Sequence, residues 1–229
     1  MINLQSVSVE YPNGVLALKD IGISISKGEF VFVVGSTGSG KSTFLKLLYR
    51  EILPTRGSVI VDDQDVTQLD SSQVPFLRRK LGIVFQDFKL LPQKNVWENL
   101  AFALKVIGVN PRDIRRRIGD VLELVGLTHR CDSFPNQMSG GEQQRAAIAR
   151  ALINHPTILI ADEPTGNLDP GTSWEIMQLL EQINIRGTTV LAATHDSQIV
   201  DRMKKRVIQL ESGSLVRDVN KGMYQHSES

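Results

Sequence analysis

A glycine-rich run early in the chain has the residue types and the spacing that bind phosphate. The run consists of Gly35, Ser36, Thr37, Gly38, Ser39, Gly40, Lys41, Ser42 and Thr43. It follows the apolar segment 30–34 and precedes a helical pattern, which is the setting of a phosphate-binding loop. Its backbone N–H groups and the start of the helix attract anions, Lys41 would reach the β- and γ-phosphates, and Ser42 would bind Mg²⁺. The sequence therefore predicts a nucleoside triphosphate site that uses the whole run.

Two adjacent carboxylates form a second candidate site. Asp162 and Glu163 directly follow the apolar segment 158–161. Because open α/β sheets bind ligands at the carboxyl ends of their strands, Asp162 is expected to hold Mg²⁺ through a water. Glu163 would point elsewhere and accept a proton from the attacking water. The alternative is a solvated acidic strand end, and the phosphate-binding loop makes that alternative the less favoured one.

A third motif stands at the start of a long helical pattern. Ser139 is expected to cap this helix, and Glu142 completes a capping box. Gly140 and Gly141 leave the first turn bare, so its N–H groups and the Ser139 hydroxyl could also meet a phosphate oxygen. Since the run 35–43 already takes the triphosphate of its own chain, this second site predicts a triphosphate held by a partner chain. We therefore expect a dimer.

The elements that must position these residues can be inferred from apolar periodicity. Alternating apolar residues before residue 26 predict half-buried antiparallel strands that form a small flanking sheet. Later apolar segments are short and uninterrupted, which is typical of parallel strands covered by helices on both faces. These segments are 30–34, 83–85, 158–161 and 189–192. The predicted fold class is therefore α/β.

Strand signals disappear between about residues 87 and 156. The stretches with helical spacing in this region are 96–107, 111–125 and 141–154. We interpret 87–156 as a helical subdomain within a single domain that covers residues 1–229. A short hairpin is predicted around 211–213, and a polar, frayed tail at about 221–229.

Composition limits the classes of function. Lys and Arg number 26 against 25 for Asp and Glu, so the net charge of +1 gives no general attraction to nucleic acid. The single cysteine, Cys131, cannot form an intrachain disulfide, which fits a reducing compartment. Every apolar run is much shorter than the about 20 residues that a helix needs to cross a bilayer. The N-terminus has no signal-peptide pattern. We expect a cytoplasmic protein.

Taken together, the motifs resemble the ATP-binding cassette (ABC) ATPases. The resemblance rests on the phosphate loop 35–43, the motif 139–143, the strand ending at 162–163, the motif 167–169, Gln86 and His195, in the family's order. It implies a P-loop NTPase fold with a RecA-like core sheet, an N-terminal antiparallel β subdomain and a helical subdomain. It also implies ATP and Mg²⁺ as cofactors. Two subunits would form a head-to-tail dimer, with each ATP between the phosphate loop of one and the motif 139–143 of the other.

The resemblance assigns roles to residues whose own patterns are ambiguous. Tyr11 would stack on adenine, although it could simply close a strand over a turn. Gln86 would approach Mg²⁺ and sense a transmembrane partner, although an amide at a strand end is also ordinary. His195 would contact the γ-phosphate, and the isolated alternative is a satisfied strand-end histidine. Asp169 joins the nucleotide-binding residues, and the catalytic group comprises Lys41, Gln86, Glu163 and His195.

Two positions depart from the commonest form of the third motif. Met138 stands where leucine is usual, and Glu142 stands where glutamine is usual. Methionine fills a similar volume, so Met138 is expected to be harmless. A carboxylate aimed at a γ-phosphate would repel it, so we expect Glu142 to face back toward Ser139.

The loop 85–92 narrows the resemblance to the bacterial cell-division branch of the family. Phe88 and Leu90 are expected to need a cover from a membrane subunit, unless they tuck under the helical subdomain. This branch implies an integral membrane partner, control of peptidoglycan hydrolases, and a peripheral location on the cytoplasmic face of the inner membrane. One alternative is a lipoprotein-release or macrolide-export ATPase, since these share the motif 165–169. Another is an ABC ATPase of DNA repair or translation, which generally needs a coiled-coil insertion or a second cassette.

Overall fold

The structure is a computed structural model that describes residues 1–222. Its strands are β1 (Ile2–Glu10), β2 (Leu16–Ile25), β3 (Phe30–Val34), β4 (Arg56–Val61), β5 (Gln64–Asp65), β6 (Leu81–Val84), β7 (Ile158–Asp162), β8 (Thr189–Thr194), β9 (Arg206–Glu211) and β10 (Ser214–Val219). Its helices are α1 (Lys41–Leu48), α2 (Val74–Arg79), α3 (Val96–Val106), α4 (Pro111–Leu124), α5 (Gly140–Leu152), α6 (Pro170–Ile185) and α7 (Ser197–Met203), with the 3₁₀ turns η1 (Thr128–Arg130) and η2 (Pro135–Gln137).

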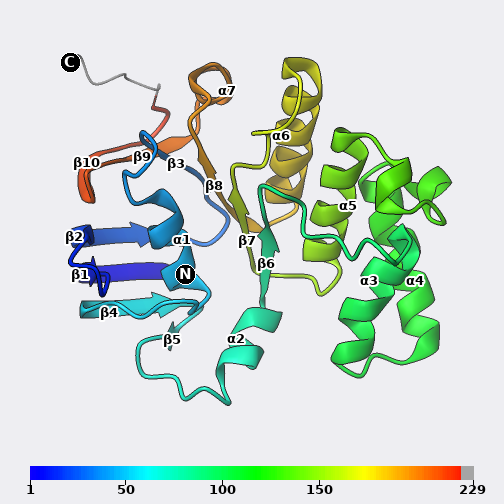
Figure 1. Ribbon diagram of the computed structural model, residues 1–229, viewed down its shortest axis with the longest axis horizontal. Coiled ribbons are helices and arrows are strands. Elements are labelled where there is room, and N and C mark those ends of the chain that lie inside the picture. The colour runs from blue at the N-terminus through cyan, green and yellow to red at the C-terminus, as the bar shows by residue number, and fades with distance from the viewer. Residues whose placement is uncertain (223–229) are drawn as a thin grey trace.

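The first sheet is antiparallel and lies at one side of the molecule (Figure 1). Its strand order is β2-β1-β4-β5. In the pairing of β1 with β2, Ile2 faces Ile25 and Leu4 faces Ile23, and all four are buried. Alternation of apolar and polar residues thus places one face of each strand on the core. The predicted small antiparallel sheet is confirmed.

The second sheet is the core of the molecule. Its order is β10-β9-β3-β8-β7-β6, and the strands from β9 to β6 pair in parallel. All five residues of β3 are buried. Phe30, Phe32 and Val34 pack with helical residues, whereas Val31 and Val33 pack with α1 and the antiparallel sheet. A strand buried on both faces explains the uninterrupted apolar segment, and the predicted α/β class is confirmed.

Helices α3, α4 and α5 gather on the far side of the core sheet from the antiparallel sheet (Figure 1). Each begins at a polar cap, which is Asn95, Asn110 or Ser139. The observed bounds differ from the predicted helical stretches by one or two residues, as is usual at helix ends. The division into one domain with a helical subdomain at about 87–156 stays a prediction.

The chain's last described elements are β9 and β10, which pair antiparallel around Ser212 and Gly213. This is the predicted hairpin. The predicted frayed tail at 221–229 falls for the most part on residues 223–229, outside the described residues. Within residues 1–222, no helix combines the length and the apolar character that a bilayer crossing requires.

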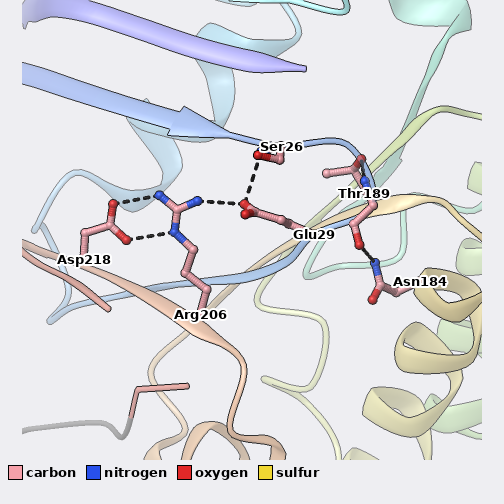
Figure 2. Close-up of polar contacts among 7 residues, drawn as sticks. Ser26, Glu29, Asn184, Thr189, Arg206 and Asp218 are labelled. Carbon is pink, nitrogen blue, oxygen red and sulfur yellow. Dashed lines mark hydrogen bonds and ion pairs between the residues drawn. The ribbon is translucent and has the colours of Figure 1, made fainter. Parts of the chain in front are cut away.

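A polar network ties this hairpin to the segment that enters β3 (Figure 2). Arg206 at the start of β9 donates two hydrogen bonds of 2.8 Å to the carboxylate of Asp218 and one of 2.7 Å to Glu29. Glu29 also accepts a hydrogen bond from the backbone N–H of Ser26. The two hydrogen bonds to Asp218, together with the one to Glu29, raise the pKa of the Arg206 guanidinium. The network fixes the position of the amino end of β3, whose carboxyl end leads into the glycine-rich loop.

Candidate nucleotide-binding and catalytic site

The glycine-rich loop joins β3 to α1 and leaves the start of α1 bare. Gly40, the N-cap residue, has φ of 106° and no side chain to cap the helix. A side-chain carbon at Gly40 would lie 2.7 Å from the carbonyl oxygen of Ala17, so only glycine fits this left-handed position. The first turn of α1 contains no acidic residue. The N–H groups of this turn therefore need partners from outside the helix, which an anion can supply.

Lys41 is the first residue of α1, and its ammonium group lies against the loop. Its side chain is only 8% exposed. The Nζ atom donates hydrogen bonds to the carbonyl oxygens of Gly35, at 2.8 Å, and Ser36, at 3.2 Å. It also lies 3.8 Å from Oε1 of Glu163. The loop thus holds a nearly buried positive charge beside the catalytic carboxylate that the sequence predicts.

A cleft of about 450 Å³ opens beside the loop. It is lined by Tyr11, Val15, Leu16, Ala17, Lys19, Gly38, Gly40, Lys41, Ser42, Thr43 and Ser212. The Tyr11 hydroxyl lies 3.0 Å from the Thr43 hydroxyl. The Tyr11 backbone also closes a turn, since its N–H donates to the Val15 carbonyl. Tyr11 therefore closes a turn, as the alternative interpretation expects, and it also lines the cleft. Its stacking on adenine stays a prediction.

The two carboxylates at the end of β7 face different surroundings. Asp162 is the last residue of β7, and Glu163 follows it with a left-handed φ of 48°. Oε2 of Glu163 lies 2.9 Å from Nδ1 of His195, which follows β8. Glu163 is 13% exposed and His195 is 66% exposed. Because β3, β8 and β7 are consecutive neighbours in the sheet, their carboxyl ends bring together Lys41, which follows the loop after β3, His195 and Glu163.

One carboxylate oxygen of Asp162 is buried and accepts no hydrogen bond from residues 1–222. Burial raises the pKa of this carboxyl, and a hydrogen bond with the Ser42 hydroxyl opposes that rise. The buried oxygen is the Oδ1 atom. A buried carboxylate oxygen beside a serine hydroxyl matches the oxygen ligands that Mg²⁺ prefers. The residues present therefore fit the metal that the sequence predicts at Ser42 and Asp162.

Gln86 and Asp169 lie around the loop that follows Glu163. The backbone carbonyl of Gln86 accepts a hydrogen bond of 3.2 Å from the Asn167 side chain. Its amide side chain lies beside Gly166. Asp169 caps α6 by accepting a hydrogen bond from the Thr172 N–H, at 3.0 Å. Asp169 thus has a structural role, and its contact with nucleotide stays a prediction, as does the approach of Gln86 to Mg²⁺ and to a membrane partner.

The start of α5 satisfies two of its N–H groups through a capping box. The Ser139 hydroxyl accepts from the Glu142 N–H, and Oε2 of Glu142 accepts from the Ser139 N–H at 2.8 Å. Arg130 binds the other oxygen of Glu142, also at 2.8 Å. Backbone hydrogen bonding to Ser139, together with Arg130, lowers the pKa of Glu142. The prediction that Glu142 faces back toward Ser139 is confirmed.

This helix start lies against α6 and apart from the loop of the same chain. A side-chain carbon at Gly141 would meet Thr172 of α6 at 2.5 Å, and one at Gly140 would meet Leu168 at 3.2 Å. Helix α1, by contrast, packs on the opposite face of the core sheet. The chain therefore does not bring Ser139, Gly140, Gly141 and Glu142 to its own phosphate-binding loop.

The loop after Gln86 is partly covered by the helices of the same chain. Leu90 is half-buried and packs against the helical core, and Phe88 is half-buried too. Arg150 of α5 fixes this loop by donating to the carbonyl oxygens of Phe88, at 2.8 Å, and Lys89. Leu90 therefore follows, in part, the alternative in which the helices cover it, and further cover by a membrane subunit stays a prediction. Sequence reasoning also missed Arg150, whose partner lies far away in the chain.

Comparisons with known proteins agree with this geometry. The family model described as "ABC transporter" matches residues 18–166. The chain is 56% identical over 224 residues to the "Cell division ATP-binding protein FtsE" of Bacillus subtilis (strain 168), with 98% of each chain covered. It is 44% identical over 215 residues to the protein of the same name from Escherichia coli (strain K12), with 94% of this chain and 97% of the relative covered. A similar solved structure is a dimeric post-hydrolysis state of the ATP-binding cassette MJ0796 bound to ADP and Pi. Its TM-score is 0.87 at 37% identity, over 98% of this chain and 100% of that one.

Proposed function

Since this chain belongs to the ABC transporter family and is an ATPase of the ABC type, we propose that it serves bacterial cell division. In this proposal it is the ATP-hydrolysing subunit of a complex with an integral membrane protein that resembles FtsX. Supporting the proposal are the FtsE relatives at 44% and 56% identity, which span nearly the full chain. The complex would act at the cytoplasmic face of the inner membrane, and we propose no nucleic-acid partner.

The observation that carries the proposed chemistry is the cluster of Lys41, Glu163 and His195. Lys41 lies at the mouth of the phosphate-binding loop, where its charge would neutralise the β- and γ-phosphates. Glu163, 2.9 Å from His195, would accept the proton of the attacking water, and His195 would orient the γ-phosphate. Mg²⁺ bound near Ser42 and Asp162 would neutralise phosphate charge. Gln86 would link this site to the membrane subunit.

We propose that two copies of the chain form composite ATP sites. The start of α5 lies away from the chain's own loop, and the dimeric solved structure of a relative supports the pairing of two copies, which we propose to be head to tail. Ser139 would then contact the γ-phosphate held by the loop of the other copy. ATP binds both copies only when they are closed, so binding stabilises the closed dimer and hydrolysis releases it.

The output of this cycle would be mechanical. Closure would move the helices α3 to α5 and pull on the cytoplasmic ends of the membrane partner, and this change would regulate peptidoglycan hydrolases outside the membrane. The alternative is the ATPase of a lipoprotein-release or macrolide-type exporter, which shares the same chemistry. The two functions differ in the membrane partner.

The experiment that tests the proposal is identification of this partner. Tagged Glu163→Gln protein would be purified from gently solubilised membranes of its host with ATP and Mg²⁺, and co-purifying membrane proteins would be identified by mass spectrometry. Recovery of a membrane subunit of the FtsX type supports the division role. Recovery of an export permease instead supports the alternative, and recovery of neither contradicts both.

A further inference from the structure

Gln144 is a polar residue in the middle of a buried face. It lies on α5, its side chain is completely buried, and its Nε2 atom lies 2.6 Å from the carbonyl oxygen of Pro164. A carbonyl oxygen only accepts hydrogen bonds, so the amide nitrogen must face it. The neighbouring positions on the same helix face, Ala147 and Ile148, are buried and apolar. The Gln144 amide is therefore the exception on an otherwise apolar helix face, and an apolar side chain of similar volume could occupy the same position.

The amide is also imperfectly satisfied, which argues against a purely stabilising role. Its Oε1 atom is buried with no hydrogen-bond partner among the described residues. An unpaired buried acceptor opposes folding, so packing alone would favour methionine or leucine at this position. Buried polar groups that are retained despite this penalty often fix one geometry among several.

The geometry that this hydrogen bond fixes belongs to the catalytic carboxylate. Pro164 directly follows Glu163, whose φ of 48° is a strained backbone conformation for a residue with a side chain. The Glu163 N–H donates to the Ala193 carbonyl at 3.0 Å, and its own carbonyl accepts from the Gly166 N–H at 3.1 Å. The contact with Gln144 adds a restraint on the next peptide group. Such a conformation persists only when its surroundings hold it from several sides.

We propose that Gln144 is a positioning residue for hydrolysis, which holds the 163–164 segment so that the Glu163 carboxylate stays beside Lys41 and His195. This inference rests on the proposed function, because it takes Glu163 to be the general base. Gln144 acts through Glu163 of its own chain, although it lies on the helix whose first residues would contact the ATP of the other copy. It therefore belongs to the site of its own phosphate-binding loop.

The first test separates kcat from KM. Gln144→Met keeps the volume and removes the donor, so kcat should fall about 10- to 100-fold because the general base is misplaced. The KM for ATP should stay within about twofold. In the Glu163→Gln background, Gln144→Met should leave ATP-dependent dimers intact by size-exclusion chromatography. An unchanged kcat, or a loss of the dimers, overturns the proposal.

Asn184→Leu is the control variant, because it also removes a side-chain amide that donates to backbone carbonyl oxygens, here from a half-buried position. Asn184 donates to the carbonyl oxygens of Gly28 and Thr188, which lie just before the amino ends of β3 and β8, whereas Glu163 follows the carboxyl end of β7. Both variants would be compared by thermal unfolding and by kcat per folded protein. Asn184→Leu should lower the melting temperature and leave kcat within about twofold. If the two variants lower kcat equally, Gln144 has only a structural role.

The second test asks which site Gln144 serves. When Lys41→Ala and Ser139→Arg subunits are mixed, each mixed dimer should have one working site. The Ser139→Arg subunit supplies the phosphate-binding loop and Glu163 of that site, and the Lys41→Ala subunit supplies Ser139. Gln144→Met added to that subunit should reduce activity as in the first test, and Gln144→Met added to the Lys41→Ala subunit should not. Equal loss from both placements, or loss only from the second, overturns the proposal. If the mixture is silent with Gln144 intact, the composite site of the proposed function fails, and the kcat and KM comparison still decides the role of Gln144.

Discussion

The starts of α1 and α5 are both helix N-termini beside glycines, but they satisfy their backbone N–H groups in different ways. At α1, Gly40 offers no cap, and the nearby charge is the buried ammonium of Lys41. At α5, Ser139 and Glu142 form a reciprocal capping box that Arg130 extends. The first helix start therefore has no side-chain cap of its own and favours an anion, whereas the second satisfies the Ser139 and Glu142 N–H groups with its own side chains. We therefore expect α1 to supply most of the affinity for a triphosphate and α5 to supply a preformed surface that closes over it.

The largest effect on turnover is expected at Glu163, the carboxylate beside Lys41 at the start of α1. Glu163→Gln keeps the shape and removes the base, so turnover should fall about 10²- to 10⁴-fold. The phosphate contacts remain, so dimers should accumulate with ATP. A steady-state phosphate-release assay and analytical ultracentrifugation measure the two quantities. Dimers that fail to accumulate would argue against this role for Glu163.

The next effect concerns affinity and tests the incomplete start of α1 directly. Lys41→Ala removes the ammonium group that lies against the loop, so ATP should bind about 10- to 100-fold more weakly. Lys46→Ala is the matched control on the same helix, since Lys46 is 38% exposed and pairs with Glu51. Its affinity for ATP should stay near that of the unchanged protein. Titration calorimetry compares the variants, and equal affinities for both would remove Lys41 from the site.

The comparison also predicts that the two helix starts act in different copies. Ser139→Arg and Lys41→Ala should each be inactive alone, because each homodimer lacks one half of both sites. Mixed in equal amounts, they should regain about a quarter of the unmodified specific activity, since half of the dimers would have one working site of two. Phosphate release measured across mixing ratios should peak near equal proportions. Absence of any recovery would contradict the composite site.

The smallest effect should come from the self-satisfied cap of α5. Ser139→Ala should lower the free energy of unfolding by about 0.5–2 kcal/mol, as is usual for loss of an N-cap. The pKa of Glu142 is lowered in the folded chain, so its contribution is present above about pH 4.3, the unfolded value, and is lost as pH falls through the folded pKa. Urea unfolding between pH 7 and pH 3 measures this. Glu142→Gln should reduce the slope of stability against pH, and an identical slope would refute the assignment.

Local chemistry decided which parts could be predicted from the sequence. The phosphate loop, the strand ending at Asp162 and the cap at Ser139 are contiguous motifs, so their local geometry follows from neighbouring residues. The resemblance to ABC ATPases, and to their cell-division branch, is confirmed by the comparisons. The roles of the individual site residues stay predictions.

Contacts between distant segments could not be predicted. Gln144 binds a carbonyl 20 residues along the chain, and Arg150 binds one 62 residues back. A signal for Gln144 was present, because it falls in the helical register of Ala147 and Ile148, where a polar residue is unexpected. For Leu90 the sequence allowed both exposure and burial, and only the packing of the helices decides between them.

The place of β3 in the core sheet has a consequence for how the protein is made. This strand lies between β8 and β9, so residues 30–34 acquire both of their neighbours only from residues 189–211. A ribosome must therefore release the chain as far as Glu211, at the end of β9, before the strand that leads into the phosphate loop can be paired on both sides. Contacts so distant in sequence slow folding, because a long loop must close before they form. We expect truncated nascent chains to remain unable to retain ATP until the last hairpin has emerged.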